Sequence, residues 1–162
     1  DKPVLNVFRM FGIMKGEWVK AESDHQYSLQ QVLDSSIRGE QTDIGVMATK
    51  ENNSAAVMLW NYHDADIKGD TTNVSISVNN IPAKKIRLTQ YRIDDAHSNA
   101  YEVWKKMGSP QNPTAEQIGA LEQAGQLQKI NNDHRTMKVA NGKFIYRLNL
   151  PRQGVSLLKL NW

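Results

Sequence analysis

Alternating apolar and polar residues fill much of the chain after residue 43, and this pattern predicts strands. Turn-forming sequences separate the alternating segments, and Asn141-Gly142 is the strongest short hairpin signal among them. The expected strands lie at 44–50, 55–62, 72–78, 86–93, 135–139, 143–150 and 155–160. About seven short strands with regular turns indicate an all-β fold, an antiparallel β-sandwich, rather than a parallel α/β sheet.

The first residues have the period of a helix. Pro3 suits a first helical position, where its missing N–H costs nothing. Apolar residues then recur at i, i+3, i+4 and i+7, which predicts one apolar stripe. The stripe consists of Val4, Val7, Phe8 and Phe11. Helix termini normally carry caps. Because no cap precedes this helix, we expect the chain to have been cut from a larger protein.

A helical excursion is expected at about 98–125, between two of the strands. Residues 98–107 can form a short helix, and Thr114 with Gln117 three positions later has the pattern of a capping box for a second one. Residues 20–43 carry no clear period, so the course of this segment stays open at the level of the sequence. Trp18 and Val19, just before it, fit a short strand.

Composition narrows the classes of function. The 162 residues contain no Cys, which excludes disulfides and thiolate metal sites. The formal net charge is +3 with both signs interspersed, which gives no reason to expect a nucleic-acid partner. No apolar run approaches the roughly 18 residues of a membrane span, so no membrane partner is expected either.

Candidate catalytic and metal-binding groups give weak signals. Asp64, Asp66 and Asp70 fit a loose cation site poorly, and a solvated turn explains them better. Asp94 and Asp95 with His97 have the composition of an acid–base group, but adjacent carboxylates in a loop are usually solvated. No phosphate-binding loop and no nucleophile elbow occurs. We therefore expect no catalytic residue, no metal and no cofactor in this chain.

Aromatic residues allow a second interpretation, in which rings stack on sugars. Trp60, Tyr62 and Tyr91 are the candidate sugar-binding residues. The alternative, which the pattern favours, is that these rings pack in the core, because Trp60 lies in an apolar strand.

The sequence from Tyr91 to Thr114 resembles the C-terminal region of family 39 glycoside hydrolases, the bacterial β-xylosidases related to α-L-iduronidase. Three further stretches agree and occur in the expected order: residues 3–12 resemble the helix that closes the family's barrel, 57–63 a sandwich strand, and 150–160 the final strand pair. The long central stretch is the specific one, and the matches together span nearly the whole chain.

The resemblance implies a parent enzyme in which a (β/α)8 barrel precedes this sandwich. Such enzymes are retaining glycosidases, with a pair of Glu carboxyl groups about 5 Å apart on the barrel. The acid/base Glu of the family lies in an Asn-Glu-Pro motif, which this chain lacks. We expect residues 1–16 to be the terminal barrel helix and 17–162 the accessory sandwich, and we expect this fragment by itself to be inactive.

The first functional hypothesis is therefore a non-catalytic domain that braces the barrel of a glycosidase acting on xylo-oligosaccharides or related glycosides. The candidate contacts with the barrel are Val4, Val7, Phe8, Phe11, His97, Ser98, Asn99, Tyr101 and Trp104. An equally weighted alternative is that the polar groups at 97–99 only fix their own loop. The second hypothesis is an independent carbohydrate-binding module for xylan-type sugars.

Two further expectations concern partners and location. An exposed apolar stripe on the first helix would also serve to pair with a second copy of the chain, giving a homo-oligomer. The resemblance to polysaccharide-degrading enzymes favours a periplasmic or extracellular location over a cytoplasmic one.

Overall fold

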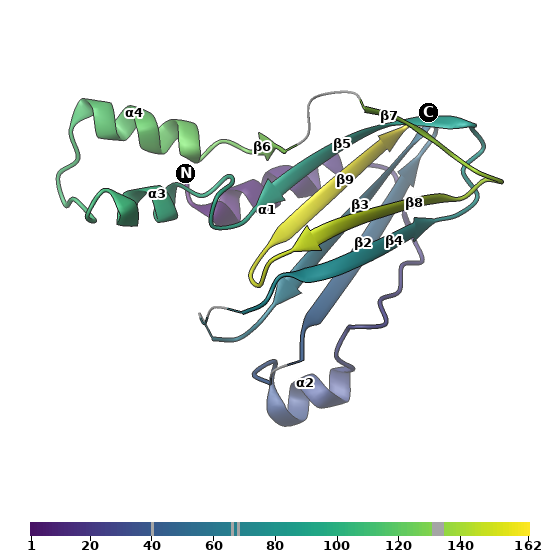
Figure 1. Cartoon of the computed structure of the whole chain (residues 1–162), viewed down its shortest axis with the longest axis horizontal. Coiled ribbons are helices and arrows are strands. Elements are labelled where there is room, and N and C mark those ends of the chain that lie inside the picture. Colours follow the sequence, from purple (N-terminus) through teal and green to yellow (C-terminus); the bar gives the residue numbers. More distant parts are fainter. Residues whose placement is uncertain (40, 66, 68, 131–134) are drawn as a thin grey trace.

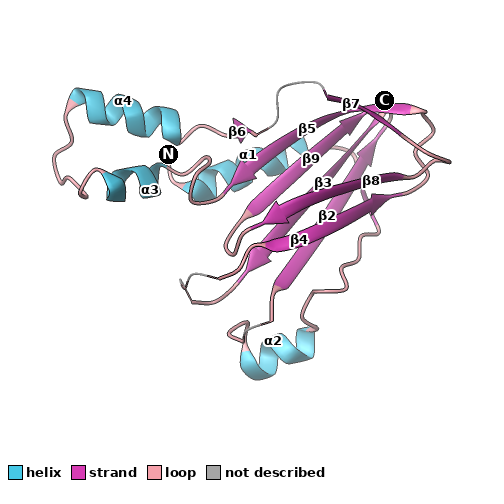
Figure 2. Ribbon diagram, in the orientation of Figure 1, coloured by secondary structure: helices cyan, strands magenta, loops and turns pink. Residues whose placement is uncertain are grey.

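The computed structural model describes residues 1–39, 41–65, 67, 69–130 and 135–162, and it shows an antiparallel β-sandwich flanked by helices (Figures 1 and 2). The helices are α1 (Pro3–Ile13), α2 (Leu29–Ser35), α3 (Ala100–Lys106) and α4 (Ala115–Ala124). The strands are β1 (Glu17–Val19), β2 (Asp43–Glu51), β3 (Ser54–Tyr62), β4 (Thr72–Val78), β5 (Lys85–Ile93), β6 (Gln128–Lys129), β7 (Arg135–Lys138), β8 (Phe144–Leu150) and β9 (Val155–Asn161). The predicted sandwich with a short helical insertion is confirmed.

The strands form two sheets of unequal size. The larger, called sheet A, has the order β1-β2-β3-β9-β5-β6, and β7 also pairs with β5. The smaller, called sheet B, consists of β4 and β8. The predicted hairpin between β2 and β3 is present, with Asp43 opposite Tyr62 and Glu51 opposite Ser54. The last strand, β9, lies between β3 and β5, so the C-terminal end of the chain is inserted into the middle of sheet A.

The main core lies between the two sheets. Side chains alternate along each strand, so Leu158 and Leu160 of β9 face sheet B whereas Leu157 packs on the opposite face. The face of sheet A that is turned to sheet B is called the inner face. The core between this face and sheet B draws on both sheets and consists of Ile44, Ala48, Val57, Leu59, Ile76, Ile81, Ile86, Leu88, Phe144, Leu148, Leu150, Leu158 and Leu160.

The Asn141-Gly142 turn is present but does not join the two strands of a hairpin. Both residues have positive φ, 50° and 72°, and Ala140 and Lys143 exchange backbone hydrogen bonds of 3.0 and 2.8 Å across the turn. Beyond that pair the strands separate, because β7 joins β5 in sheet A and β8 joins β4 in sheet B. The turn is therefore a corner between the sheets, and the hairpin predicted at 135–150 is wrong beyond its first residue pair.

The segment that the sequence left open contains α2, which begins at a capping box. Ser28 Oγ accepts from Gln31 N at 3.3 Å, and Gln31 Oε1 accepts from Ser28 N at 2.9 Å. No residue of α2 is buried, so its cap stabilises the helix more than packing does.

The insertion between β5 and β6, residues 98–125, is called the helical arm. Its two helices, α3 and α4, lie beside each other and next to the N-terminus, beyond the end of the sheets (Figure 1). The predicted capping box of α4 is present at Thr114 and Gln117. No residue of α3 or α4 is buried. Helices in the described part of the chain are all too short or too polar to cross a membrane.

Candidate functional site

Helix α1 lies on the face of sheet A that points away from sheet B, which is called the outer face. Met10 is fully buried there and packs with Ala56, Met58, Ile93 and Leu157 from three strands. The sequence pattern did not predict this contact, because the expected apolar stripe lies largely on the other side of the helix. One side of α1 is therefore an integral part of the sandwich.

The opposite side of α1 is apolar and exposed. The exposed fractions are 58% for Val4, 40% for Leu5, 66% for Phe8 and 42% for Phe11, and these four residues are called the outer patch. Of the predicted stripe, Val7 alone packs toward the sandwich. A helix that is apolar on both sides is typical of one buried between two layers, and in this structure a single layer is present.

The three candidate sugar-binding residues lie on the outer face but on two strands. Trp60 and Tyr62 are two positions apart in β3, whereas Tyr91 is in β5, across β9. Trp60 lies against Gly45, where an added Cβ would be 2.1 Å from the indole ring. Trp60 and Tyr91 pack around the Met10 cluster, and Tyr62 is 45% exposed. Trp60 and Tyr91 are therefore engaged in packing on the outer face, and Tyr62 is the exposed ring of the three.

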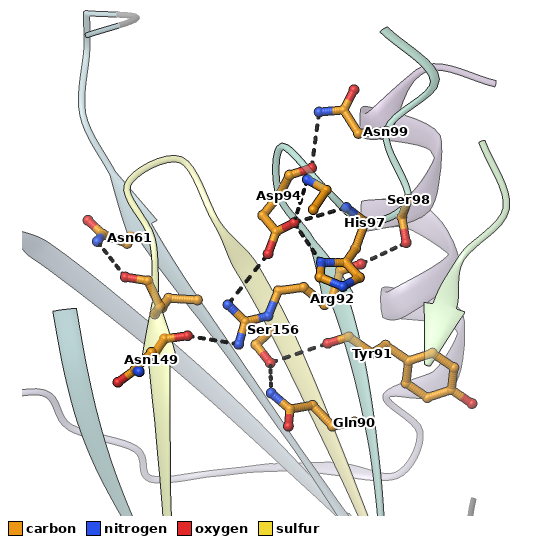
Figure 3. Close-up of polar contacts among 12 residues, drawn as sticks. Asn61, Gln90, Tyr91, Arg92, Asp94, His97, Ser98, Asn99, Asn149 and Ser156 are labelled. Atoms are coloured by element: carbon orange, nitrogen blue, oxygen red, sulfur yellow. Dashed lines mark hydrogen bonds and ion pairs between the residues drawn. The ribbon is translucent and has the colours of Figure 1, made fainter. Parts of the chain in front are cut away.

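The loop after β5 is held by the carboxylate of Asp94 (Figure 3). Its Oδ1 accepts from the backbone N–H groups of Ala96 and His97, both at 2.9 Å, and lies 2.8 Å from Nδ1 of His97. Asn99 donates to the Asp94 carbonyl at 3.2 Å and caps α3 by accepting from Glu102 N at 3.3 Å. These contacts fix the backbone of the loop, so the carboxylate is engaged in structure rather than poised as an acid or base.

Ser98 is fully buried and connects the loop to the end of the helical arm. Its hydroxyl donates to the Arg92 carbonyl at 2.6 Å and accepts from Gln128 N at 2.8 Å. Its own carbonyl accepts from Asn6 Nδ2 at 3.0 Å. Within this chain Ser98 therefore has no free surface, although the contact with a barrel predicted for this loop stays a prediction.

The two aromatic residues predicted to contact a barrel stack on each other in α3. The ring centroids of Tyr101 and Trp104 are 5.8 Å apart, and Trp104 Nε1 donates to the Pro110 carbonyl at 3.0 Å. Lys105 lies over the Tyr101 ring at 4.9 Å from its centroid. Tyr101 is 53% exposed, so an aromatic edge of the arm remains available to a neighbour.

Buried polar side chains fill the inner face next to this loop (Figure 3). Arg92 donates to the Asn149 carbonyl at 3.0 Å, and its Nη1 lies 3.9 Å from Asp94 Oδ2. Burial lowers the pKa of Arg92, against the charges of Asp94 and Tyr146, which raise it. This network closes one end of the core, where Arg92 Nε and Asn61 Oδ1 are buried without a hydrogen-bond partner among the residues that the structure describes.

The weak cation site of the sequence analysis falls partly on Asp66, which lies outside the described residues. Asp64 accepts from Ile37 N at 3.1 Å and from Arg38 Nε at 3.3 Å, so its carboxylate is already paired. Over the parts of the chain that the structure describes, no cluster of three His, Cys, Asp or Glu residues is arranged to hold a metal ion.

Comparison with protein families now identifies the chain. The family model of the glycosyl hydrolases family 39 matches residues 1–138. The chain belongs to glycosyl hydrolase family 39. A comparison with curated protein sequences finds no match.

Solved structures of family 39 enzymes contain a domain of the same fold. The chain is similar to the family 39 enzyme of Xanthomonas axonopodis pv. citri, with a TM-score of 0.72 and 15% identity over 95% of this chain and 29% of that one. It is also similar to a monomeric β-xylosidase of Caulobacter crescentus, with a TM-score of 0.69 and 17% identity over the same shares of the two chains. A bacterial orthologue of human α-L-iduronidase gives a TM-score of 0.57 at 16% identity, over 75% and 22%.

The chain thus spans less than a third of the length of these family 39 enzymes. At such low identity the likeness of structures establishes the shared fold. It supports the expectation that this sandwich is one part of a larger glycosidase, and it does not transfer the substrate of any neighbour to this chain.

Proposed function

We propose that this chain is the non-catalytic sandwich domain of a retaining family 39 glycosidase and that it braces the enzyme's (β/α)8 barrel. The parent enzyme would hydrolyse O-glycosidic bonds in xylo-oligosaccharides or related glycosides. The observation that carries the proposal is the outer patch of α1, which leaves one side of a doubly apolar helix uncovered.

The size of the outer patch makes an unoccupied surface costly. Val4, Leu5, Phe8 and Phe11 are about half exposed, so covering them would contribute roughly 3–6 kcal/mol. If α1 is the last helix of the barrel, this patch turns toward the barrel strands while Met10 holds the other side to the sandwich. A single helix would then belong to the core of both domains.

The direction of α1 orients the proposed assembly. In a (β/α)8 barrel each helix follows its strand and runs antiparallel to it, so the helix begins at the catalytic face. The helical arm lies at the beginning of α1, where the carbonyl of Gly125 meets Asn6. This arrangement favours contact between the arm and the catalytic rim of the barrel, with Tyr101 and Trp104 as its aromatic edge.

The test is a charge placed in the outer patch of the full-length enzyme. Phe8→Glu should lower the melting temperature of the enzyme by several degrees, because a carboxylate would be buried against the barrel. Leu33→Glu is the matched control, since Leu33 is 71% exposed on α2 and Phe8 is 66% exposed. In the 162-residue chain both variants should be near neutral. Equal, small effects of both variants in the full-length enzyme would refute the bracing function.

The absence of catalysis in this domain has its own test. The 162-residue chain should release no chromophore from an aryl xyloside, because the family's pair of catalytic Glu residues belongs to the barrel. Release that survives further purification of the chain would overturn this part of the proposal.

A second candidate function is sugar binding by the domain itself. Trp60 and Tyr62 share the outer face of β3, and Tyr62 is exposed beside the indole that covers Gly45. Titration calorimetry of the 162-residue chain with xylotriose would detect such a site. Heat of binding that disappears in Tyr62→Ala would favour it, whereas no heat at millimolar sugar would reject it.

A further inference from the structure

Asn6 joins α1 to both ends of the helical arm. Its side-chain amide is fully buried and donates to two carbonyls, those of Ser98 and Gly125, each at 3.0 Å. Ser98 begins the arm and Gly125 ends it. A single side chain of α1 therefore fixes both connections between the arm and the sandwich.

Neighbouring groups hold the Asn6 amide in this orientation. Arg9 Nη1 donates to Asn6 Oδ1 at 2.7 Å and to the Gly125 carbonyl at 3.3 Å, and Arg9 Nη2 pairs with Asp1 at 2.7 Å. With Oδ1 accepting from a guanidinium, Nδ2 must face the two carbonyls. The Asn6 amide and the carbonyls of Ser98 and Gly125, which its hydrogen bonds join, are together called the latch.

Besides the latch, the buried Ser98 hydroxyl ties the two ends of the arm together through the Arg92 carbonyl and Gln128 N, and the helices themselves add little. No residue of α3 or α4 is buried, and their packing is against each other rather than on the sheets. A two-helix arm without a core of its own takes its position from its two connections. The latch is the buried polar contact that joins those connections to α1.

We propose that Asn6 is a positioning residue, whose amide sets the place of the helical arm relative to α1 and thereby to the catalytic rim of the barrel. The placement of the arm at the catalytic rim rests on the proposed function. Asn6 touches no reacting atom. It acts through the arm, which would border the sugar units that project beyond the cleaved bond.

The test compares two buried asparagines in the full-length enzyme. Asn6→Leu keeps the size of the side chain and removes both donors, so the Ser98 carbonyl loses its Asn6 partner and the Gly125 carbonyl keeps only the longer bond from Arg9, at 3.3 Å. Asn61→Leu is the matched control, because Asn61 is also buried and donates to the Leu150 carbonyl at 3.2 Å and to Thr72 at 3.4 Å, away from the arm.

Two measurements are made on each variant. Amide hydrogen exchange should rise across residues 98–125 in Asn6→Leu and stay at the wild-type rate there in Asn61→Leu. KM for xylotriose should rise at least about threefold in Asn6→Leu, with kcat within twofold and with KM for an aryl xyloside unchanged, since a misplaced arm affects only the longer substrate. If Asn6 only stabilised the fold, Asn6→Leu would change KM for xylotriose and for the aryl xyloside alike.

The outcomes separate this inference from the proposed function. Wild-type exchange of the arm in Asn6→Leu would overturn the latch and leave the bracing function standing, because the outer patch is untouched. Raised exchange with unchanged KM for xylotriose would overturn the placement of the arm at the rim, and Phe8→Glu then reports separately on bracing. If Asn6→Leu fails to fold, Arg9→Met loosens the same latch from its partly exposed side and should give the same changes, smaller in size.

Discussion

The two faces of sheet A differ in how completely this chain covers them. The inner face packs against sheet B through a core of buried aliphatic and aromatic side chains, and Leu158 and Leu160 at its centre are fully buried. The outer face is covered by one helix, whose own outer patch is exposed. The same strands therefore carry a buried core on the inner face, beside an open groove of about 730 Å³ lined by Val46, Val74 and Ile76 among others, and a smaller core under one helix on the outer face.

Under the proposed function, this difference separates residues that fold the domain from residues that contact the barrel. Apolar residues on the inner face gain their stabilisation within the chain, so removing them weakens the isolated domain. Apolar residues of the outer patch gain theirs only in contact with another surface. Variants made in the 162-residue chain and in the full-length enzyme should therefore diverge at the outer patch and agree at the inner face.

The largest effect is expected at the centre of the inner face. Leu158→Ala should lower the free energy of unfolding of the 162-residue chain by about 2–5 kcal/mol, because it leaves a cavity between the sheets. Urea unfolding followed by tryptophan fluorescence measures it. Phe8→Ala, in the outer patch, should cost about 0.5 kcal/mol or less in the same chain. Similar losses in the two variants would abolish the distinction between the faces.

A smaller effect is expected where the outer face is already packed by this chain. Gly45→Ala would put a Cβ 2.1 Å from the Trp60 indole, and moving the ring should cost about 1–3 kcal/mol. The same urea unfolding measures the loss. In a Trp60→Leu background the added methyl should cost much less. An equal cost in both backgrounds would show that the strain does not arise from the indole.

The sequence predicted the inner face better than the outer one, for a physical reason. Strand alternation at 72–78 and 86–93 depends on neighbours within the sheet, so a period of two suffices to predict it. In α1 both sides are apolar, and the period alone does not tell which side faces the sandwich. Asn6 was the available signal, because a polar residue one turn from Met10 on an apolar helix suggests a specific buried partner.

The sequence did not predict how strands far apart in the chain pair with one another. The turn at Asn141-Gly142 was predicted correctly, but its residues do not determine which sheet each flanking strand joins. The short strand β6 and its pairing with β5 left no periodic signal, since it contains only Gln128 and Lys129. Such pairings depend on the partner strand rather than on the segment itself.

The helical arm is a third region for comparison, since capping rather than a buried core stabilises its helices. Thr114→Ala removes the acceptor for Gln117 N, at 3.2 Å, and should destabilise α4 by about 0.5–2 kcal/mol. Amide exchange should rise within residues 115–124 and stay constant in the sheets. Ser28→Ala, in the matching capping box of α2, should act only on residues 29–35. Exchange that rises in the sheets as well would mean that the arm and the sandwich unfold together.

The smallest effect in this comparison is expected from two glycines of the arm that differ in backbone conformation. At both Gly119 and Gly108 an added Cβ meets no atom within 4 Å, but Gly108 has a φ of 85° and Gly119 lies within α4. Gly119→Ala should slow exchange in α4, since Ala is favoured over Gly in a helix by about 0.5–1 kcal/mol. Gly108→Ala should instead speed exchange at the end of α3, because a positive φ costs an L-residue about 1 kcal/mol. The sandwich strands should not respond to either variant, because neither glycine contacts them. If both variants changed the exchange of α3 and α4 in the same direction, backbone conformation would not distinguish the two sites. Packing of the arm against another surface would then have to explain the result.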